Sequence, residues 1–343
     1  MAQRWMIYGA NGYTGQLVAR LAVARGEQPV LAGRRAEPLA ALGAELGLAH
    51  RTVELTDEAA LRAGLADVDL VAHCAGPFVR TAAPMVDACL ATGTHYLDVT
   101  GEIDVYEEVF ARHAEAVAAK VVLLPGAGFD VVPTDCLAAM LVAALPGAIS
   151  LELAFRSRGG LSPGTAATAL LGAGVGGKRR IGGVLQPSPF GVPSRVVPFP
   201  SGPRRVGAIP WGDLATAYRS TGIADITTYA VLRPPPVPVQ YLMRYGVVQA
   251  LGARLVARFV SGPSARTRAS TGVEVWGEVR DAAGATSSAA LVGPNAYDLT
   301  ADAVVRIAGR VLAGGIPPGA HTPATALGAD FIRELDGVTV QEP

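Results

Sequence analysis

The chain of 343 residues is poor in the residue types on which several common kinds of site depend. Its three cysteines, Cys74, Cys89 and Cys136, have neither Cys-x-x-Cys nor metal-ligand spacing. We therefore expect buried free thiols and a reducing compartment. The five histidines are scattered and include no His-Glu-x-x-His pair, so no metal is expected.

Lysine and long apolar runs are also scarce. Only Lys120 and Lys178 occur, and neither follows a tyrosine by four positions, so the Tyr/Lys proton relay of short-chain dehydrogenases is absent. Apolar stretches such as residues 136–145 are too short to cross a bilayer, and no signal segment precedes the first expected strand. The sequence predicts a cytoplasmic protein, with peripheral membrane contact as an alternative.

Charge is balanced overall but unevenly placed along the chain. Basic and acidic residues number 10 and 18 in residues 1–152, 15 and 2 in residues 153–273, and 4 and 9 in the remainder. An excess of this size predicts that the middle of the chain recognises an anionic group. Residues 178–180 (Lys-Arg-Arg) are expected in a glycine-rich loop that suits a phosphate.

A glycine-rich segment, residues 9–15, directly follows the apolar run at residues 5–8. This order predicts a strand, a tight turn and a helix whose N-terminus supplies N–H groups to a pyrophosphate. The three glycines allow the turn, the approach of the phosphates, and close packing of the helix. The residues predicted to bind a dinucleotide here are Gly9, Asn11, Gly12, Tyr13, Thr14 and Gly15.

The next expected strand, residues 29–32, ends in Gly33-Arg34-Arg35. Enzymes that use NAD place an acidic residue near this point to bond the ribose 2′-hydroxyl, whereas a guanidinium accommodates a 2′-phosphate. Two arginines and no acid predict NADP as the cofactor, with Arg34 and Arg35 as its contacts.

Strands and helices alternate regularly up to about residue 132, which predicts an α/β, Rossmann-type, doubly wound parallel sheet. The expected strands are residues 5–8, 29–32, 50–54, 69–73, 95–99 and 121–124, and the expected helices are residues 13–25, 38–46, 57–65, 82–91 and 106–119.

From residue 149 the pattern changes to longer strands with turn signals, which predicts an inserted α+β substrate domain with a mostly antiparallel sheet. Proline-rich stretches at residues 186–203 and 233–238 are expected as loops or sheet edges. Residues 241–260 alternate basic and apolar side chains at helical spacing, which fits an interfacial helix or a packed, dimer-forming one. Two helices are expected in the tail, at residues 300–312 and 323–335.

Ligands of open α/β sheets bind beyond the carboxyl ends of the strands. Three such ends, residues 74–78, 98–102 and 125–130, combine glycine with polar or aromatic residues. Asp57 either bonds the adenine amino group or caps its helix. The residues expected to line the nicotinamide ribose are Cys74, Ala75, Gly76 and Pro77.

Hydride transfer needs a positioned donor carbon and a source for the proton. The candidates for the proton donor are Asp130, Glu102 and Tyr96, because all three fall at strand ends. Each also has a structural interpretation: Asp130 as a helix cap, Glu102 as a first-turn carboxylate, and Tyr96 as a core residue.

Together these segments resemble the saccharopine dehydrogenase-like oxidoreductases, and the bacterial trans-acting enoyl reductases of lipid and polyketide assembly are the most similar branch. The resemblance covers the first 140 residues and the tail, and only loosely the middle. It implies a nucleotide-binding domain at residues 1–132, a substrate domain at 133–317 and a C-terminal segment, 318–343, that returns to the first domain. The segments that carry it are residues 9–15, 31–35, 74–78, 93–102, 126–135 and 322–328.

The leading hypothesis is an NADPH-dependent reductase of a C=C bond in a lipid- or polyketide-like, anionic or carrier-linked substrate. A C=N reductase of the saccharopine type and a non-catalytic NADP-binding sensor or scaffold remain open. The expected partners are a small-molecule or acyl-thioester substrate, an acyl carrier protein and a second copy of the chain in a homodimer; no nucleic acid is expected.

Overall fold

The computed structural model describes residues 4–166, 176–231, 248, 252 and 260–342. They form two compact units, and the chain passes between the units more than once. The first unit comprises Met1–Phe129 and Tyr297–Leu327, and the second comprises Asp130–Ala296 and Gly328–Pro343. The return to the first unit thus begins at Tyr297, ahead of the expected position 318, and the last residues belong to the second unit.

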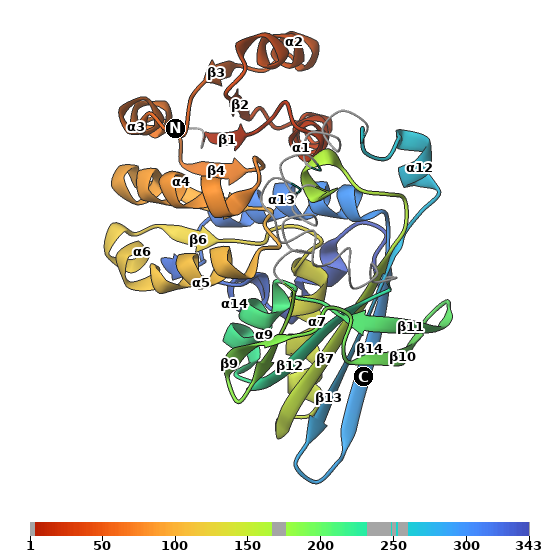
Figure 1. The fold of residues 1–343 in the computed structure, drawn as a ribbon. Coiled ribbons are helices and arrows are strands. Elements are labelled where there is room, and N and C mark those ends of the chain that lie inside the picture. Colours follow the sequence, from red (N-terminus) through yellow and green to blue (C-terminus); the bar gives the residue numbers. More distant parts are fainter. Residues whose placement is uncertain (1–3, 167–175, 232–247, 249–251, 253–259, 343) are drawn as a thin grey trace. The chain divides into compact units, whose positions relative to one another are not determined.

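A parallel sheet of seven strands, ordered β15-β6-β5-β4-β1-β2-β3, is the centre of the first unit (Figure 1). The order reverses between β1 and β4, which is the switch point where ligands bind in folds of this kind. The strands are β1 (Trp5–Tyr8), β2 (Val30–Gly33), β3 (His50–Thr52), β4 (Leu70–His73), β5 (His95–Asp98), β6 (Val122–Leu124) and β15 (Gly319–Ala320).

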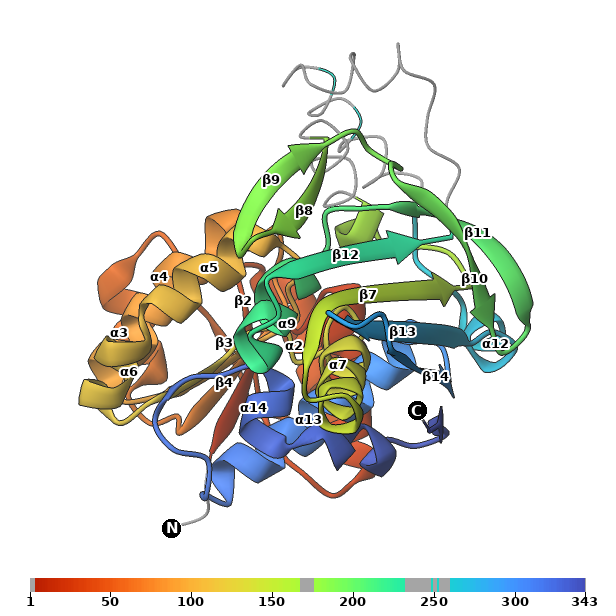
Figure 2. The same cartoon turned by 90° about the horizontal axis from the view of Figure 1, so that it is seen from below.

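Helices cover this sheet, and α3 to α6 form one layer (Figure 2). Helix α1 packs with α13, because Tyr13 meets Tyr297 edge-on at 4.9 Å between ring centroids and Arg25 pairs with Asp302. The helices are α1 (Tyr13–Ala24), α2 (Ala36–Leu46), α3 (Glu58–Leu65), α4 (Phe78–Thr92), α5 (Ile103–Ala111), α6 (His113–Ala119), α13 (Ala296–Leu312) and α14 (Pro323–Leu327).

Two helices expected to be continuous are interrupted. The helix expected over residues 106–119 divides into α5 and α6 at Arg112. The helix expected over residues 323–335 stops at Leu327, because Gly328 has a φ of 85°. A 3₁₀ helix, η1 (Ala329–Glu334), follows it in the second unit.

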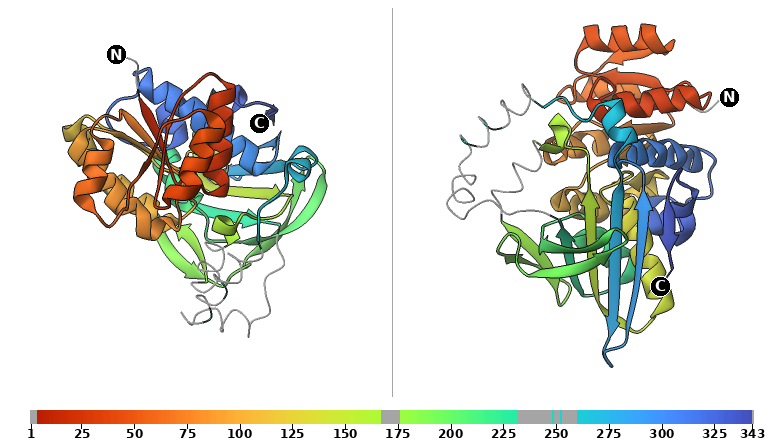
Figure 3. Two further views of the ribbon diagram at one scale, coloured as in Figure 1. Left: turned by 90° about the horizontal axis from the view of Figure 1, so that it is seen from above. Right: turned by 90° about the vertical axis from the view of Figure 1, so that its right-hand side faces the viewer.

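The described residues of the second unit form a nine-stranded sheet in which most neighbouring strands are antiparallel, and among these strands β12 and β7 run parallel. Figure 3 shows its long blue strands β13 and β14 side by side. The strands are β7 (Ala148–Ser157), β8 (Gly177–Ile181), β9 (Val184–Ser188), β10 (Ser194–Phe199), β11 (Gly202–Ala208), β12 (Asp225–Ala230), β13 (Val273–Asp281), β14 (Thr286–Gly293) and β16 (Thr339–Gln341). The helices are α7 (Val132–Ala144), α9 (Asp213–Thr221) and α12 (Ala265–Ala269).

Both faces of this sheet bury apolar side chains. Helix α7 lies close to one face, since a Cβ at Gly277 would come within 2.7 Å of Leu141 and 3.1 Å of Leu153. On the opposite face a second cluster forms, which includes Trp276, the neighbour of Gly277 on β13, and to which the β10–β11 hairpin contributes Val197 and Phe199. The sequence predicted the parallel and mostly antiparallel sheets correctly, but the elements it missed include β8, β9, β11, β16, α9 and α12. The predicted helix at residues 241–260 lies almost wholly outside the described residues.

Candidate functional site

The glycine-rich turn after β1 is shaped by close backbone contacts. Gly9 has a φ of 81°, a conformation that favours glycine. A Cβ at Gly15 would lie 2.3 Å from the Gly9 carbonyl oxygen, so only glycine lets α1 begin this close to the turn. No side chain caps α1 and no acid stands in its first turn. This helix N-terminus therefore fits a pyrophosphate.

The segment after β4 lies against the same turn. The Cys74 amide donates to the Tyr8 carbonyl over 2.8 Å, and a Cβ at Gly9 would approach the Ala75 nitrogen to 2.9 Å. The hydroxyl of Thr81 donates to the Ala75 carbonyl over 2.8 Å and holds this segment in place. The structure thus brings two predicted cofactor-binding segments, residues 9–15 and 74–77, together at the switch point between β1 and β4.

Two exposed arginines follow β2. Arg34 and Arg35 stand between the strand and α2, whose N-cap is Arg35. With the Asn11 amide oriented so that its oxygen faces Arg35, that oxygen accepts hydrogen bonds from Arg35 Nη2 at 2.7 Å and from Nε at 3.3 Å. These hydrogen bonds therefore join the glycine-rich turn directly to Arg35, the predicted contact of the 2′-phosphate.

Asp57 adopts the capping role that was one of its two interpretations. Its carboxylate accepts a hydrogen bond of 2.9 Å from the Ala60 amide and caps α3. The side chain is exposed. A contact with the adenine amino group stays a prediction.

Asp98, at the end of β5, belongs to a strand end that the sequence marked, but its role as a buried junction was not predicted. It accepts hydrogen bonds from the Tyr96 hydroxyl (2.7 Å), the Thr100 amide (3.0 Å) and the Gly126 amide (2.8 Å). Burial raises the pKa of Asp98 to about 6, although these hydrogen bonds favour its ionised form. Asp98 therefore ties together the loops that follow β5 and β6.

Two of the predicted proton donors are engaged in structural contacts. The Tyr96 side chain is fully buried, its hydroxyl donates to Asp98, and burial raises the Tyr96 pKa well above its ordinary value. The Glu102 carboxylate accepts hydrogen bonds from the amides of Phe78 (3.0 Å) and Val79 (2.7 Å) at the start of α4. Both contacts hold backbone at the carboxyl edge of the parallel sheet.

Asp130, the third candidate, begins the second unit and precedes α7. The Trp211 indole donates to the Asp130 carbonyl over 2.7 Å, and its ring packs on Phe155 with centroids 4.7 Å apart. This contact fixes the backbone of Asp130 without using its carboxylate.

A second acid near Asp130 was not predicted. Asp213, in the first turn of α9, is 1% exposed, and within the described residues neither of its carboxylate oxygens has a hydrogen-bond partner. The nearby Thr134 hydroxyl instead donates to the Val131 carbonyl over 3.0 Å. Burial raises the pKa of Asp213 well above its ordinary value, and Asp135 and Asp130 raise it further.

The prediction of a phosphate-binding loop at residues 178–180 is wrong. These residues lie in strand β8, which pairs with β9. Arg180 is 5% exposed, donates to the carbonyls of Leu214 and Gly183, and stacks 4.2 Å above the Tyr218 ring. Its guanidinium therefore stabilises the second unit.

Part of the positive excess is also neutralised by acids from the flanking sequence. On the β-sheet, Arg195 pairs with Glu152 and lies 3.6 Å from Glu278, and Arg156 pairs with Glu274 at 3.0 Å. All three acids lie just outside the basic stretch 153–273 but on strands β7 and β13. The excess of basic residues in the sequence of this stretch is therefore larger than the excess of positive charge around it in the folded protein.

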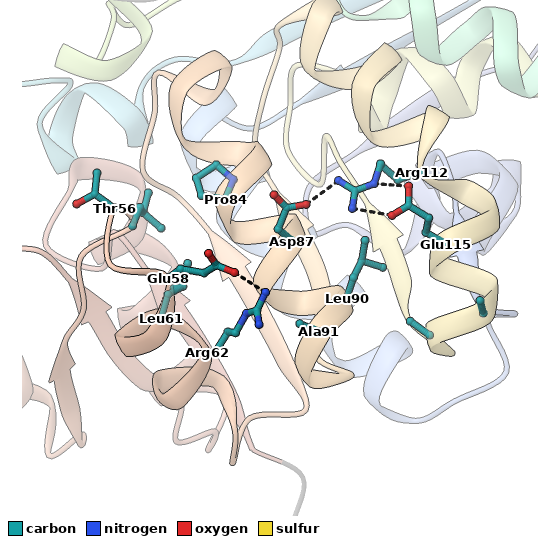
Figure 4. Close-up of a pocket in the computed structure, with 13 residues that line it drawn as sticks. Thr56, Glu58, Leu61, Arg62, Pro84, Asp87, Leu90, Ala91, Arg112 and Glu115 are labelled. Carbon is teal, nitrogen blue, oxygen red and sulfur yellow. Dashed lines mark hydrogen bonds and ion pairs between the residues drawn. The ribbon is translucent and has the colours of Figure 1, made fainter.

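The first unit also has a surface pocket of about 770 Å³ over α3, α4 and α6 (Figure 4). Its rim carries the Glu58–Arg62 pair and Arg112, which bridges Asp87 and Glu115. None of the residues predicted to bind the nucleotide lines this pocket.

Two other kinds of feature are absent from the part of the chain that the structure describes. Its histidines, cysteines and acids form no group of three or more that could hold a metal ion. None of its helices has the length and apolar character needed to cross a membrane.

The sequence of the first unit is similar to that of known proteins. Residues 5–124 match the saccharopine dehydrogenase NADP binding domain. The trans-acting enoyl reductases of Mycobacterium leprae and Mycobacterium tuberculosis (strain ATCC 25618 / H37Rv) are 33% and 32% identical over 138 and 144 residues. Another protein from the second strain, whose name proposes the same activity, is 36% identical over 144 residues. Each match covers 38% of this chain and only 33%, about a third, of the relative.

The fold comparison extends over the whole chain. Apo saccharopine dehydrogenase (L-Glu forming) from Saccharomyces cerevisiae aligns with a TM-score of 0.68 over 99% of both chains, at 12% identity. At this identity the likeness shows a shared fold. The sequence match spans the glycine-rich cradle, and residues 5–124 are therefore similar to the NADP binding domain of saccharopine dehydrogenase.

Proposed function

We propose that the protein is an NADPH-dependent reductase of a C=C bond in an acyl chain carried as a thioester. The observation that carries this proposal is the N-terminus of α1, which no side chain caps, with Arg34 and Arg35 between the end of the neighbouring strand β2 and α2, where no acid stands. This arrangement suits a dinucleotide that carries a 2′-phosphate. The names of the mycobacterial relatives favour an enoyl acceptor.

The proposed roles of the cofactor residues follow their positions at the switch point. The backbone amides of residues 9–15 bind the pyrophosphate, Arg34 and Arg35 bind the 2′-phosphate, Asp57 lies by the adenine, and residues 74–77 line the nicotinamide ribose. Bound NADPH would supply the hydride. The Asp98 and Glu102 contacts keep the carboxyl edge of the sheet ordered, so that the reacting carbons meet in a fixed geometry.

For the proton we favour Asp130 over Tyr96 and Glu102. The Tyr96 hydroxyl is fully buried and already donates to Asp98, while the Glu102 carboxylate accepts two amide hydrogens. Asp130 is partly exposed, and its backbone is fixed by Trp211. In the balanced reaction the hydride goes to one carbon of the double bond and the proton from Asp130 goes to the other.

Replacing Asp130 with asparagine is expected to lower kcat by about 100-fold, the lower end of what general acids contribute. NADPH affinity should stay near that of the wild type, since a group that acts only in the transition state leaves ground-state binding unchanged. Steady-state kinetics and nucleotide titration measure the two effects. An unchanged kcat, or an equal loss of NADPH affinity, would remove Asp130 from this role; Asp281→Asn is the control for loss of a carboxylate in the same unit.

Replacing Arg34 with alanine is expected to weaken NADPH binding by about tenfold or more and to leave NADH binding almost unchanged. The reason is that a hydrogen bond to a charged group contributes about 1.5–3 kcal/mol. Titration of both nucleotides measures the effect. Arg62→Ala is a matched control, because it removes the same charge from the exposed face of α3. Equal losses for the two nucleotides would contradict the assignment.

Three classes of acceptor separate the proposal from its alternatives. NADPH is offered with enoyl thioesters, with imines formed from amino acids, and with simple ketones. Consumption with enoyl thioesters supports the proposal, and attachment of the chain to an acyl carrier protein or to coenzyme A tests the carrier. Consumption with imines alone indicates a C=N reductase, and consumption with none favours a non-catalytic NADP-binding protein.

A further inference from the structure

We propose that Asn11 is a positioning residue for cofactor specificity: it holds the Arg35 guanidinium in place to receive the 2′-phosphate of NADP(H). The inference rests on the proposed contact between Arg35 and that phosphate. It assigns to Asn11 a role distinct from the pyrophosphate binding of the surrounding glycines.

The contact between Asn11 and Arg35 has a geometry that fixes the guanidinium. One amide oxygen of Asn11 accepts from two nitrogens on the same edge of Arg35, Nη2 at 2.7 Å and Nε at 3.3 Å. A guanidinium has five N–H donors in a rigid plane, so two bonds to one edge fix the orientation of that plane. Three donors remain, including both on Nη1, and they can bind a phosphate.

Asn11 is itself held in place by hydrogen bonds of the glycine-rich turn. Its backbone carbonyl accepts a hydrogen bond of 3.1 Å from Gln16 Nε2. The turn is anchored to β2 by the amides of Gly9 and Ala10, which donate to the Ala32 carbonyl over 2.8 and 3.1 Å. Gly33 leaves room for the Asn11 side chain, because a Cβ there would lie 3.0 Å from one terminal atom of the Asn11 amide. The support for Arg35 is therefore part of the cofactor cradle.

Asn11 also leaves the positive charge of Arg35 intact. The Arg35 side chain is exposed, and an exposed arginine otherwise samples many rotamers, which costs binding free energy when a ligand orders it. Asn11 orders the guanidinium in advance and, being neutral, leaves its positive charge for the phosphate. An aspartate at this position would pair with the same nitrogens and neutralise the charge.

Two substitutions separate ordering from charge. Asn11→Ala is expected to weaken NADPH binding by about two- to tenfold, the range for ordering one long side chain, with little change for NADH. Asn11→Asp is expected to weaken NADPH binding by about tenfold more than Asn11→Ala, because it adds a negative charge beside the 2′-phosphate. Direct binding by calorimetry measures both and requires no substrate.

A double-mutant cycle decides whether Asn11 acts through Arg35. In an Arg35→Ala background, Asn11→Ala should no longer change the ratio of NADPH to NADH affinity, whereas in an Arg34→Ala background its effect should persist. Additive effects with Arg35→Ala, or equal losses for the two nucleotides, would overturn the inference. If the wild type shows no preference for NADPH, the 2′-phosphate contact itself fails. If Arg35→Ala abolishes the preference and Asn11→Ala leaves it intact, only the role of Asn11 fails.

Discussion

Replacing Gly15 with alanine is expected to weaken the binding of NADPH and NADH alike by about 100-fold or more. The added methyl carbon would lie 2.3 Å from the Gly9 carbonyl oxygen and 2.8 Å from the Ala10 Cα, both of them backbone atoms of the turn. The start of α1 must therefore move away from the position in which its amides meet the pyrophosphate. Loss of two hydrogen bonds to a charged group, at about 1.5–3 kcal/mol each, gives an effect of this size.

Calorimetric titration of both nucleotides measures this effect, and thermal unfolding shows whether the variant is folded. Gly309→Ala is the matched control, because a Cβ at that exposed position of α13 meets nothing within 4 Å. The control should bind both nucleotides normally. Since the pyrophosphate is common to both, Gly15→Ala should preserve the ratio of their affinities, unlike Arg34→Ala. Affinity within about threefold of the wild type would show that the turn does not hold the pyrophosphate.

Replacing Asp213 with asparagine is expected to remove a marked pH dependence of stability. Burial raises the pKa of Asp213 in the folded protein well above its ordinary value of 3.8, so the folded state keeps the proton where the unfolded state has lost it. The unfolded state then binds fewer protons, and the free energy of unfolding falls as the pH rises between the two pKa values. The slope is about 1.4 kcal/mol per pH unit in that window.

Urea unfolding of the wild type and of Asp213→Asn between about pH 5 and about pH 7 measures this difference. The variant should gain stability relative to the wild type as the pH rises, because an amide does not ionise. Asp225→Asn, which removes an exposed carboxylate from the same unit, should give a curve parallel to the wild type. Parallel curves for Asp213→Asn as well would show that Asp213 is ionised in the folded state.

Sequence spacing was sufficient to predict the parts of the fold and site that depend on local order along the chain. The glycines at positions 9, 12 and 15, the arginines after the second strand and the alternation of strands with helices gave the parallel sheet and the NADP-binding domain. Strand ends could be recognised because a parallel sheet collects them at one edge. The residues of segment 74–77 were therefore expected at this edge, and the structure places them against the glycine-rich turn.

Contacts between segments distant in sequence could not be predicted in this way. Glu102 caps α4 from a different loop, and Asp213 loses its solvent only when α9 packs with α7. Arg35 can donate its hydrogen bonds to Asn11 only because the loops after β1 and β2 lie close together. Gly33, which has no side chain, allows this approach. The prediction from the basic stretch failed in part for the same reason. Glu152 and Glu274, which pair with Arg195 and Arg156, lie on neighbouring strands of the sheet but outside that stretch of sequence.

The central claim is that a hydride passes from NADPH to the double bond of an enoyl thioester. Reaction with NADPH that carries deuterium at the transferable position of the nicotinamide tests it most directly, with mass spectrometry of the reduced acyl chain. The account predicts one deuterium per product molecule on the carbon that accepts the hydride, and a proton from water on its neighbour. A saturated product that contains no deuterium, or deuterium found only in an amine formed from an imine, would contradict it.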